Sequence, residues 1–178
     1  GVQRNAVPAA THTITVDDHP EPVALSAMKQ DDGGVFTDYT PQAASDAPDD
    51  VFVLPLSPAV DDAAYFGALS KFGFLTIAMT TPGIGIWTIK WEYWNGAAWS
   101  EFPVAAGLVD GTQAFQVIGE GVVTVAALPA DWTKTAVDGA EGFYWRARVD
   151  FALGGITQAK AGKVTAWIPH LLNTAGET

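Results

Sequence analysis

Three carboxylates close to a predicted hairpin have the residue type and spacing for acid and base chemistry. Glu92, Glu101 and Asp110 are near one another in the sequence, and glycoside hydrolysis needs only two carboxyl groups about 5 to 10 Å apart. However, the chain contains twenty Asp and Glu residues, so such neighbours arise readily by coincidence. We therefore interpret these three side chains as solvated surface charge.

Other catalytic and metal-binding patterns are missing from the sequence. The three histidines lack the i, i+2 or i, i+4 spacing that places two imidazoles on one metal ion; they are His12, His19 and His170. No serine lies in a Gly-x-Ser-x-Gly segment, and there is no cysteine to act as nucleophile or zinc ligand. We expect a protein that is not an enzyme and needs no cofactor.

Two acidic pairs supply the hard oxygen ligands that calcium prefers. Asp49-Asp50 and Asp61-Asp62 flank the start of the aromatic-rich part of the chain. They lack the alternating Asp-x-Asp-x-Asp-Gly arrangement that marks a calcium loop. Calcium therefore remains an alternative and is not part of the main prediction.

Tryptophan is the abundant residue with binding potential, with seven in the chain. Trp87, Trp91 and Trp145 fall on the apolar faces of predicted strands, so we expect them in the core. Trp94 and Trp99 stand on either side of a predicted turn, where they either pair across the hairpin or face outward. Outward-facing rings would suit a sugar ring or a subunit contact.

Two arginines lie two residues apart on one strand face of an acidic protein. Arg146 and Arg148 can pair with carboxylates of the same subunit, which we favour, or with those of a neighbour. Together with the aromatic residues they complete the predicted contact site for a ligand or a subunit, which consists of Trp94, Asn95, Trp99, Trp132, Arg146 and Arg148.

The elements that position these residues are predicted to be short strands. Residues 86–94 and 143–151 alternate apolar and polar side chains, with Phe151 on the apolar face. Asn95-Gly96 suits a two-residue type I′ turn, after which 99–102 would return antiparallel. Further strands are predicted at 73–80, 122–126 and 163–168, and single helical turns within 58–69 and 130–136. We expect an all-β, antiparallel two-sheet sandwich of jelly-roll or related type.

The first fifty residues differ from the rest in composition. They hold five prolines and three Asp-Asp pairs, but only two of the twenty aromatic residues. This composition favours extended chain, with one or two strands, such as 11–16 and 23–28, that could dock on a neighbour. We predict an extended N-terminal arm over 1–50, a sandwich domain over 51–169 and a C-terminal tail over 170–178.

Charge and hydropathy exclude several classes of partner. The net charge of −11 opposes binding to nucleic acid or anionic lipid. Every apolar stretch is shorter than a membrane span, and no signal peptide opens the sequence. We expect a mature protein that binds neither nucleic acid nor membranes.

An ordered set of aromatic motifs resembles a domain that recurs in structural proteins of tailed bacteriophages and related viruses. The resemblance covers about residues 51–168 and rests on four segments, Ala64–Gly67, Trp87–Trp99, Asp131-Trp132 and Gly142–Val149. It implies a β-sandwich that serves as a virion component, on the capsid surface or on the tail, and it brings no catalytic residue.

Within that class, a short chain with one sandwich and an extended arm favours a capsid decoration or cement protein. The expected partners are the major capsid protein or other virion subunits and further copies of the chain. If the arm orders on assembly, deleting residues 1–45 should abolish shell binding and leave the sandwich folded. The alternative is a carbohydrate-binding or receptor-binding module of a phage tail or baseplate, with a glycan on Trp94, Trp99 or Trp132.

Overall fold

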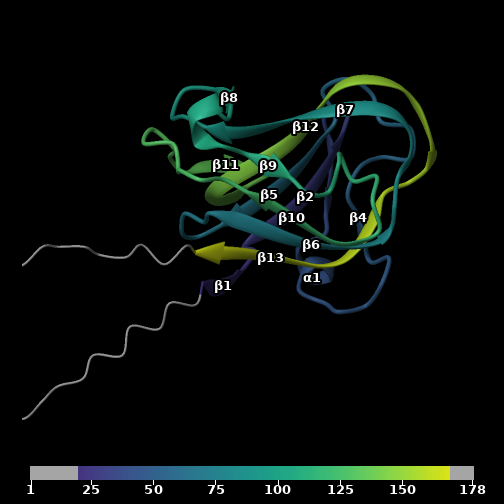
Figure 1. Cartoon of the computed structure of the whole chain (residues 1–178), viewed down its shortest axis with the longest axis horizontal. Helices are drawn as coiled ribbons and strands as arrows, with labels where there is room; N and C mark the ends of the chain where they lie inside the picture. Colours follow the sequence, from purple (N-terminus) through teal and green to yellow (C-terminus); the bar gives the residue numbers. More distant parts are fainter. Residues whose placement is uncertain (1–19, 169–178) are drawn as a thin grey trace, which may run out of the picture.

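Two antiparallel sheets pack face to face in the computed structural model, which describes residues 20–168 (Figure 1). The predicted strand at 11–16, the tail at 170–178 and all three histidines lie outside the described residues. Thirteen strands, one short α-helix and one 3-10 turn make up the described part. This confirms the predicted all-β two-sheet sandwich.

The first sheet has five strands in one row and a sixth attached to β13. The row is β1 (Glu21–Ala24), β13 (Lys160–Ile168), β6 (Phe74–Thr81), β10 (Gly119–Thr124) and β9 (Val109–Asp110), and β4 (Val51–Phe52) pairs with β13. The helix α1 (Thr40–Ala43) lies near β13 and β2, and the 3-10 turn η1 covers Val104–Ala106.

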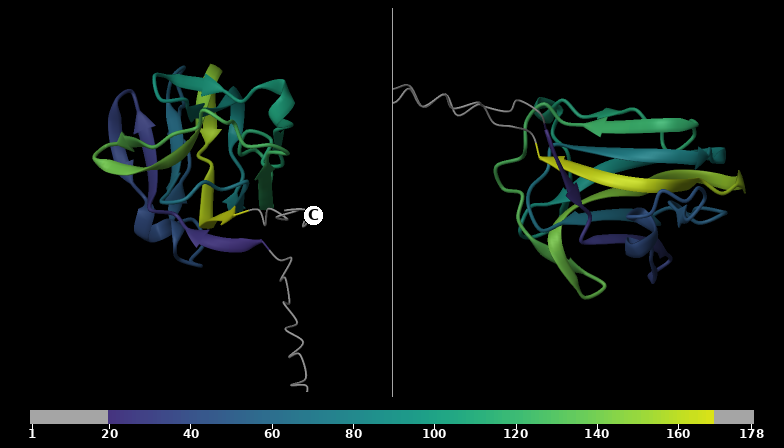
Figure 2. Two further views of the ribbon diagram at one scale, coloured as in Figure 1. Left: turned by 90° about the vertical axis from the view of Figure 1, so that its left-hand side faces the viewer. Right: turned by 90° about the horizontal axis from the view of Figure 1, so that it is seen from below.

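The second sheet has six strands in one row and a seventh attached to β12. The row is β3 (Val35–Asp38), β2 (Ala27–Asp32), β5 (Ala63–Ala68), β12 (Ala140–Thr157), β7 (Ile84–Trp94) and β8 (Trp99–Glu101), and β11 (Thr135–Val137) pairs with β12. The right-hand view of Figure 2 shows β10, β6 and β13 side by side in the first sheet.

The order of the strands is that of a jelly roll. Strands β5, β6 and β7 alternate between the second and first sheets, and so do β10, β12 and β13. The rows β1-β13-β6-β10 and β5-β12-β7-β8 are therefore the two four-stranded sheets of a jelly roll, a fold that contains two Greek keys. The β2–β3 hairpin extends the second sheet beyond β5.

Aromatic rings fill the space between the sheets. Trp145 on β12 lies at the centre, with ring centroids of Phe72 and Phe102 at 4.8 Å and 5.0 Å from its own. Trp91 packs edge-on against Trp145 at 6.5 Å, and Trp87 is also buried. The prediction of Trp87, Trp91 and Trp145 as core residues is confirmed.

The predicted boundary at residue 50 is wrong, because the sandwich already begins at Glu21. Strand β1 pairs with β13, and β2 pairs with β5, so both belong to the sheets. Pro22 is tolerated because β1 is an edge strand, and Asp31-Asp32 precedes the Gly33-Gly34 turn of the β2–β3 hairpin. The prolines and aspartates mark edges and turns, and these strands pair within the chain.

The hairpin after β7 has a four-residue loop where a two-residue turn was predicted. Trp94 pairs with Trp99, so residues 95–98 form the loop. Of these, only Gly96 has a positive φ, whereas a type I′ turn needs two such residues. The Asn95 side chain accepts hydrogen bonds from the backbone N–H groups of Ala97 and Ala98 at 3.0 Å and 2.8 Å, which closes the longer loop.

Strand β12 carries three irregularities that change which side chains face outward. Its register against β7 shifts at three places, where Asp150, Leu153 and Ile156 are each inserted as an extra residue. A bulge of this kind reverses the phase of alternation. Phe151 is 46% exposed as a result, so its predicted place on the inner face is wrong.

Residues 63–68 of the segment 58–69 form β5, where a single helical turn was predicted. All six residues of β5 are buried, since its two faces are both covered. In residues 20–168, no helix is long and apolar enough to cross a membrane.

Candidate functional site

Four of the six predicted contact residues lie together on the outer face of the second sheet. Trp94 comes from the end of β7, Trp99 from β8, and Arg146 and Arg148 from β12. Asn95 lies in the loop after β7, where its side chain binds Ser100 and the N–H groups of the loop and does not join the other four. These side chains face outward because the inward positions of β7 and β12 hold the core tryptophans. Strand alternation therefore assembles this part of the predicted site.

Trp132, the sixth residue, belongs to the core, so its prediction as a contact residue is wrong. Its side chain is 1% exposed, and its indole N–H donates to the carbonyl oxygen of Tyr144 at 3.2 Å. Phe72 and Phe143 pack edge-on against its ring. Trp132 lies in the loop between β10 and β11, where no alternating pattern shows which way a side chain points.

A buried carboxylate joins the two arginines. Glu92 on β7 is 6% exposed and accepts hydrogen bonds from Nε of Arg146 and from Nε of Arg148, the latter at 3.0 Å. Arg148 also contacts Asp61 at 3.1 Å and Asp150 at 3.5 Å. Both arginines are thus neutralised within the subunit, as the favoured interpretation of the sequence predicted.

The aromatic residues of the site pack on each other and on Arg146. Trp94 and Trp99 form a cross-strand pair with centroids 5.6 Å apart at 69°. Tyr65 on β5 packs edge-on against Trp99 at 5.4 Å, and its hydroxyl accepts a hydrogen bond from Nη1 of Arg146 at 3.2 Å. Packing across the hairpin, the first of the two predicted alternatives, is therefore the observed one, and both rings still lie on the outer face.

Burial and charge act in opposite directions on the titratable groups here. Burial raises the pKa of Tyr65, and this outweighs the nearby Arg146, which favours the ionised phenol. For Arg148, burial alone would lower the pKa, but the hydrogen bond and charge of Glu92 outweigh it, and the pKa is raised. Arg148 therefore keeps its positive charge, and Tyr65 keeps its proton.

The three carboxylates considered for glycoside chemistry are held by other side chains or by a loop. Glu92 is buried and bound to the two arginines, so its interpretation as solvated surface charge is wrong. Its cross-strand partner Glu101 pairs with Lys90 at 3.2 Å. Asp110 lies on β9 of the other sheet, where it accepts hydrogen bonds from the backbone and hydroxyl of Thr112. The structure therefore does not bring the three together.

Three of the four aspartates considered for calcium are bound to protein donors. Asp49 accepts hydrogen bonds from the hydroxyls of Thr80 and Thr81. Asp62 accepts from the backbone N–H groups of Gly33 and Ala59, and Asp61 pairs with Arg148. Within the part of the chain that the structure describes, no three His, Asp or Glu side chains form a metal-binding group.

A second surface of the same sheet was not predicted from the sequence. At the other end of the β7–β12 ribbon, five large apolar side chains are exposed: Ile84, Ile86, Phe151, Leu153 and Ile156. We call these five residues the ribbon patch. The bulged residues Leu153 and Ile156 are 72% and 80% exposed, because each bulge directs an extra side chain away from the core.

The ribbon patch lies where β7 begins and β12 arches toward β13, at the right-hand end of Figure 1. Its exposed apolar surface is on the order of 600 Å², at the upper end of the range for monomeric proteins. Residues 72–89 and 151–159 contain no charged side chain, although the chain has a net charge of −11. This surface can therefore bind a partner through apolar contacts.

Searches of family models, curated proteins and solved structures find no match to this chain.

Proposed function

We propose that the chain is a non-enzymatic virion structural protein that decorates the outside of a viral shell. The observation that carries the proposal is the ribbon patch, a large uncharged apolar surface on an otherwise acidic sandwich. A patch of this size is at the upper end of what monomeric proteins expose, and the largest patch on a protein is often a contact surface. The resemblance of the aromatic motifs to phage structural domains supports the virion as the place of that contact.

The size of the patch favours attachment through many copies, each of which makes a modest contact. A surface of this size on each side buries about 1,200 Å², the lower end of stable interfaces. One such contact is modest, but many symmetric copies on a shell add up. The proposed partners are the major capsid protein or a neighbouring copy of the chain, and the net negative charge keeps unbound copies apart in solution.

The charged and aromatic cluster beside the hairpin has a supporting role in this proposal. Glu92, Arg146 and Arg148 neutralise one another, and Trp94 and Trp99 pack together, so the cluster fixes β8 and β12 on β7. The alternative of a glycan on these rings has less support, because Arg146 lies over Trp99 and the two rings cover part of each other.

The test uses particles of the encoding virus from which this gene has been deleted. Purified chain is mixed with these particles, and bound protein is measured after sedimentation. Wild-type chain is expected to saturate the particles, and the double variant Leu153→Ser/Ile156→Ser is expected to lose most binding. Val104→Ser is the matched control, because Val104 is 99% exposed but lies in η1, outside the patch.

Two results would overturn the proposal. One is the absence of this chain from wild-type particles after gradient purification. The other is equal binding by the wild-type chain and the double variant. Circular dichroism of each variant shows that the fold is intact, which we expect because the substituted side chains are mostly exposed.

A further inference from the structure

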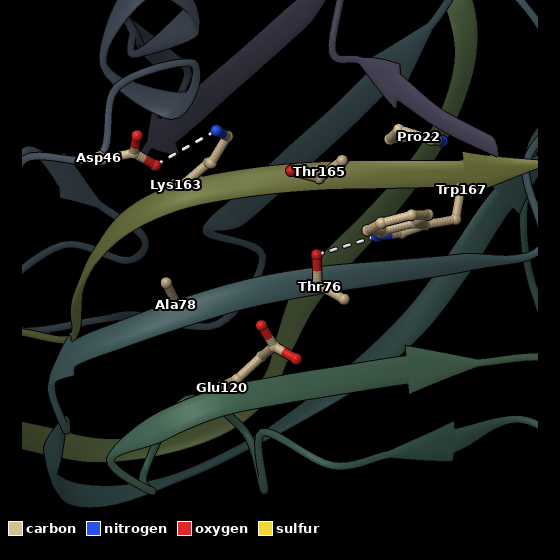
Figure 3. A pocket seen from close by; sticks show the side chains of 8 residues that line it. All are labelled: Pro22, Asp46, Thr76, Ala78, Glu120, Lys163, Thr165 and Trp167. Atoms are coloured by element: carbon tan, nitrogen blue, oxygen red, sulfur yellow. Dashed lines mark hydrogen bonds and ion pairs between the residues drawn. The ribbon is translucent and has the colours of Figure 1, made fainter. Parts of the chain in front are cut away.

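A groove of about 470 Å³ lies on the outer face of the first sheet, whereas the ribbon patch belongs to strands of the second sheet (Figure 3). It runs across β10, β6 and β13. The groove exists because the middle strand carries small side chains there, Thr76 and Ala78, between longer ones on its two neighbours. Thr165 on β13, the cross-strand partner of Thr76, completes the floor.

One end of the groove is aromatic and is held rigidly. The indole of Trp167 is stacked on Phe74 with centroids 5.5 Å apart and planes within 6° of parallel. Its Nε1–H donates to Oγ1 of Thr76 at 3.0 Å, so the ring extends over the groove, as Figure 3 shows. The Thr76 hydroxyl accepts this bond and keeps its own proton for another acceptor.

The other end of the groove is polar. Glu120 on β10, the cross-strand partner of Ala78, is exposed and has no hydrogen bond or ion pair with any residue in 20–168. Lys163 on β13 is paired with Asp46 at 3.2 Å across the rim. The groove thus combines a fixed indole, two threonine hydroxyls and a carboxylate that has no partner among these residues.

We propose that this groove binds a neutral saccharide. A sugar ring has an apolar C–H face, which can pack on the indole, and hydroxyls at its edge, which can donate to Glu120 and exchange hydrogen bonds with Thr76 and Thr165. Few and convergent polar groups beside an apolar wall are typical of small-ligand sites. An anionic ligand is disfavoured by Glu120, Asp46 and the net charge of −11, and a wholly apolar ligand would desolvate the carboxylate without a partner.

This site is independent of the proposed attachment to a shell. It lies on the other sheet and uses none of the residues of the ribbon patch. A chain that binds a shell through the ribbon patch would therefore keep the groove residues free for a second ligand.

The test is a two-dimensional NMR titration of the ¹⁵N-labelled full chain. The probes are cellobiose, maltose, lactose and N,N′-diacetylchitobiose at millimolar concentration. At least one disaccharide is expected to shift the Trp167 indole N–H signal and the Thr76 amide in a saturable manner. Glu120→Gln is expected to weaken that binding about tenfold, the effect of one hydrogen bond to a charged group.

Matched controls separate the site from general effects. Glu141→Gln removes an equally exposed carboxylate from β12 in the other sheet, and it should leave the affinity unchanged. The Leu153→Ser/Ile156→Ser variant should also bind the sugar normally, so failure of either proposal can be recognised alone. No saturable shift with any of the four disaccharides, or a shift that Glu120→Gln leaves unaltered, overturns the saccharide site. The same titration is also run with a lysine-containing peptide. A response to this peptide and to none of the sugars overturns the saccharide site in favour of a cationic ligand.

Discussion

The guanidinium group of Arg146 lies 4.6 Å from the ring centroid of Trp99. These two residues belong to β12 and β8, which do not pair with each other, since β7 lies between them. Arg146 thus reaches across β7 to the edge strand and is bound on the way by Glu92. A planar guanidinium can stack on the indole and bind the carboxylate at the same time, which a lysine ammonium cannot.

Glu92→Gln should destabilise the fold by about 3 kcal/mol, because it leaves two arginines largely buried without their shared counter-charge. The side chains of Arg146 and Arg148 are 16% and 18% exposed in these pairs. Urea denaturation followed by tryptophan fluorescence measures the free energy of unfolding. Glu101→Gln is the control on the facing strand, and its exposed pair with Lys90 should cost less than about 1 kcal/mol. Equal effects of the two substitutions would contradict a stabilising role for the buried carboxylate.

Trp132→Ala should cost about 4 kcal/mol, because it removes a fully buried ring from the core. Trp94→Ala removes a half-buried ring and one aromatic pair, with an expected cost of about 1 kcal/mol. The comparison tests the corrected assignment of Trp132 to the core. If both substitutions cost the same in urea denaturation, Trp132 is not a core residue.

The strands with clear alternation could be predicted from the sequence. Alternation on β7 predicted that Trp87 and Trp91 face the core and that Glu92 lies on the opposite face, but it did not predict that Glu92 is buried between the two arginines. The same pattern on β12 predicted the faces of Trp145 and Arg146 correctly.

Two features could not be predicted from alternation. Strand β5 (Ala63–Ala68) is buried on both faces, so its small and aromatic residues show no alternation of apolar and polar positions to set a period. The bulges of β12 depend on backbone register against β7, which the sequence does not display, and they place Phe151 outside. The ribbon patch was missed for this reason. Its sequence signals are the uncharged runs over 72–89 and 151–159, the second of which contains Gly154-Gly155 and Ile156.

Deletion of residues 1–45 should unfold the sandwich, contrary to the expectation of a dispensable arm. It removes β1, β2, β3 and α1, including Ala27 and Met28, which are fully buried. Deletion of residues 1–19 keeps every described strand and is the matched control. Circular dichroism and thermal unfolding of both truncated proteins measure the outcome. A cooperative transition in the shorter protein near that of the full chain would show that β1–β3 are not needed for the fold.

Tyr144 should make the fold less stable at alkaline pH. Burial raises its pKa from 10.0 to about 12, and its hydroxyl donates to the carbonyl oxygen of Ala140 at 2.8 Å. Below pH 10 the phenol is protonated in both the folded and unfolded states, so it adds no pH dependence there. Between about pH 10 and 12 the unfolded chain loses this proton and the folded chain keeps it, and the free energy of unfolding falls by about 2 to 3 kcal/mol.

The other tyrosines and Lys29 also titrate above their ordinary range, so the contribution of Tyr144 has to be isolated by substitution. Tyr144→Phe keeps the buried ring and removes the ionisable hydroxyl. Its free energy of unfolding, measured in urea at a series of pH values, should be lower than that of the wild type at neutral pH because the hydrogen bond to Ala140 is lost. The difference should shrink as the pH rises through this window, because only the wild type loses stability through this phenol. Parallel curves for the two proteins would show that the Tyr144 hydroxyl titrates normally and is therefore not shielded from water.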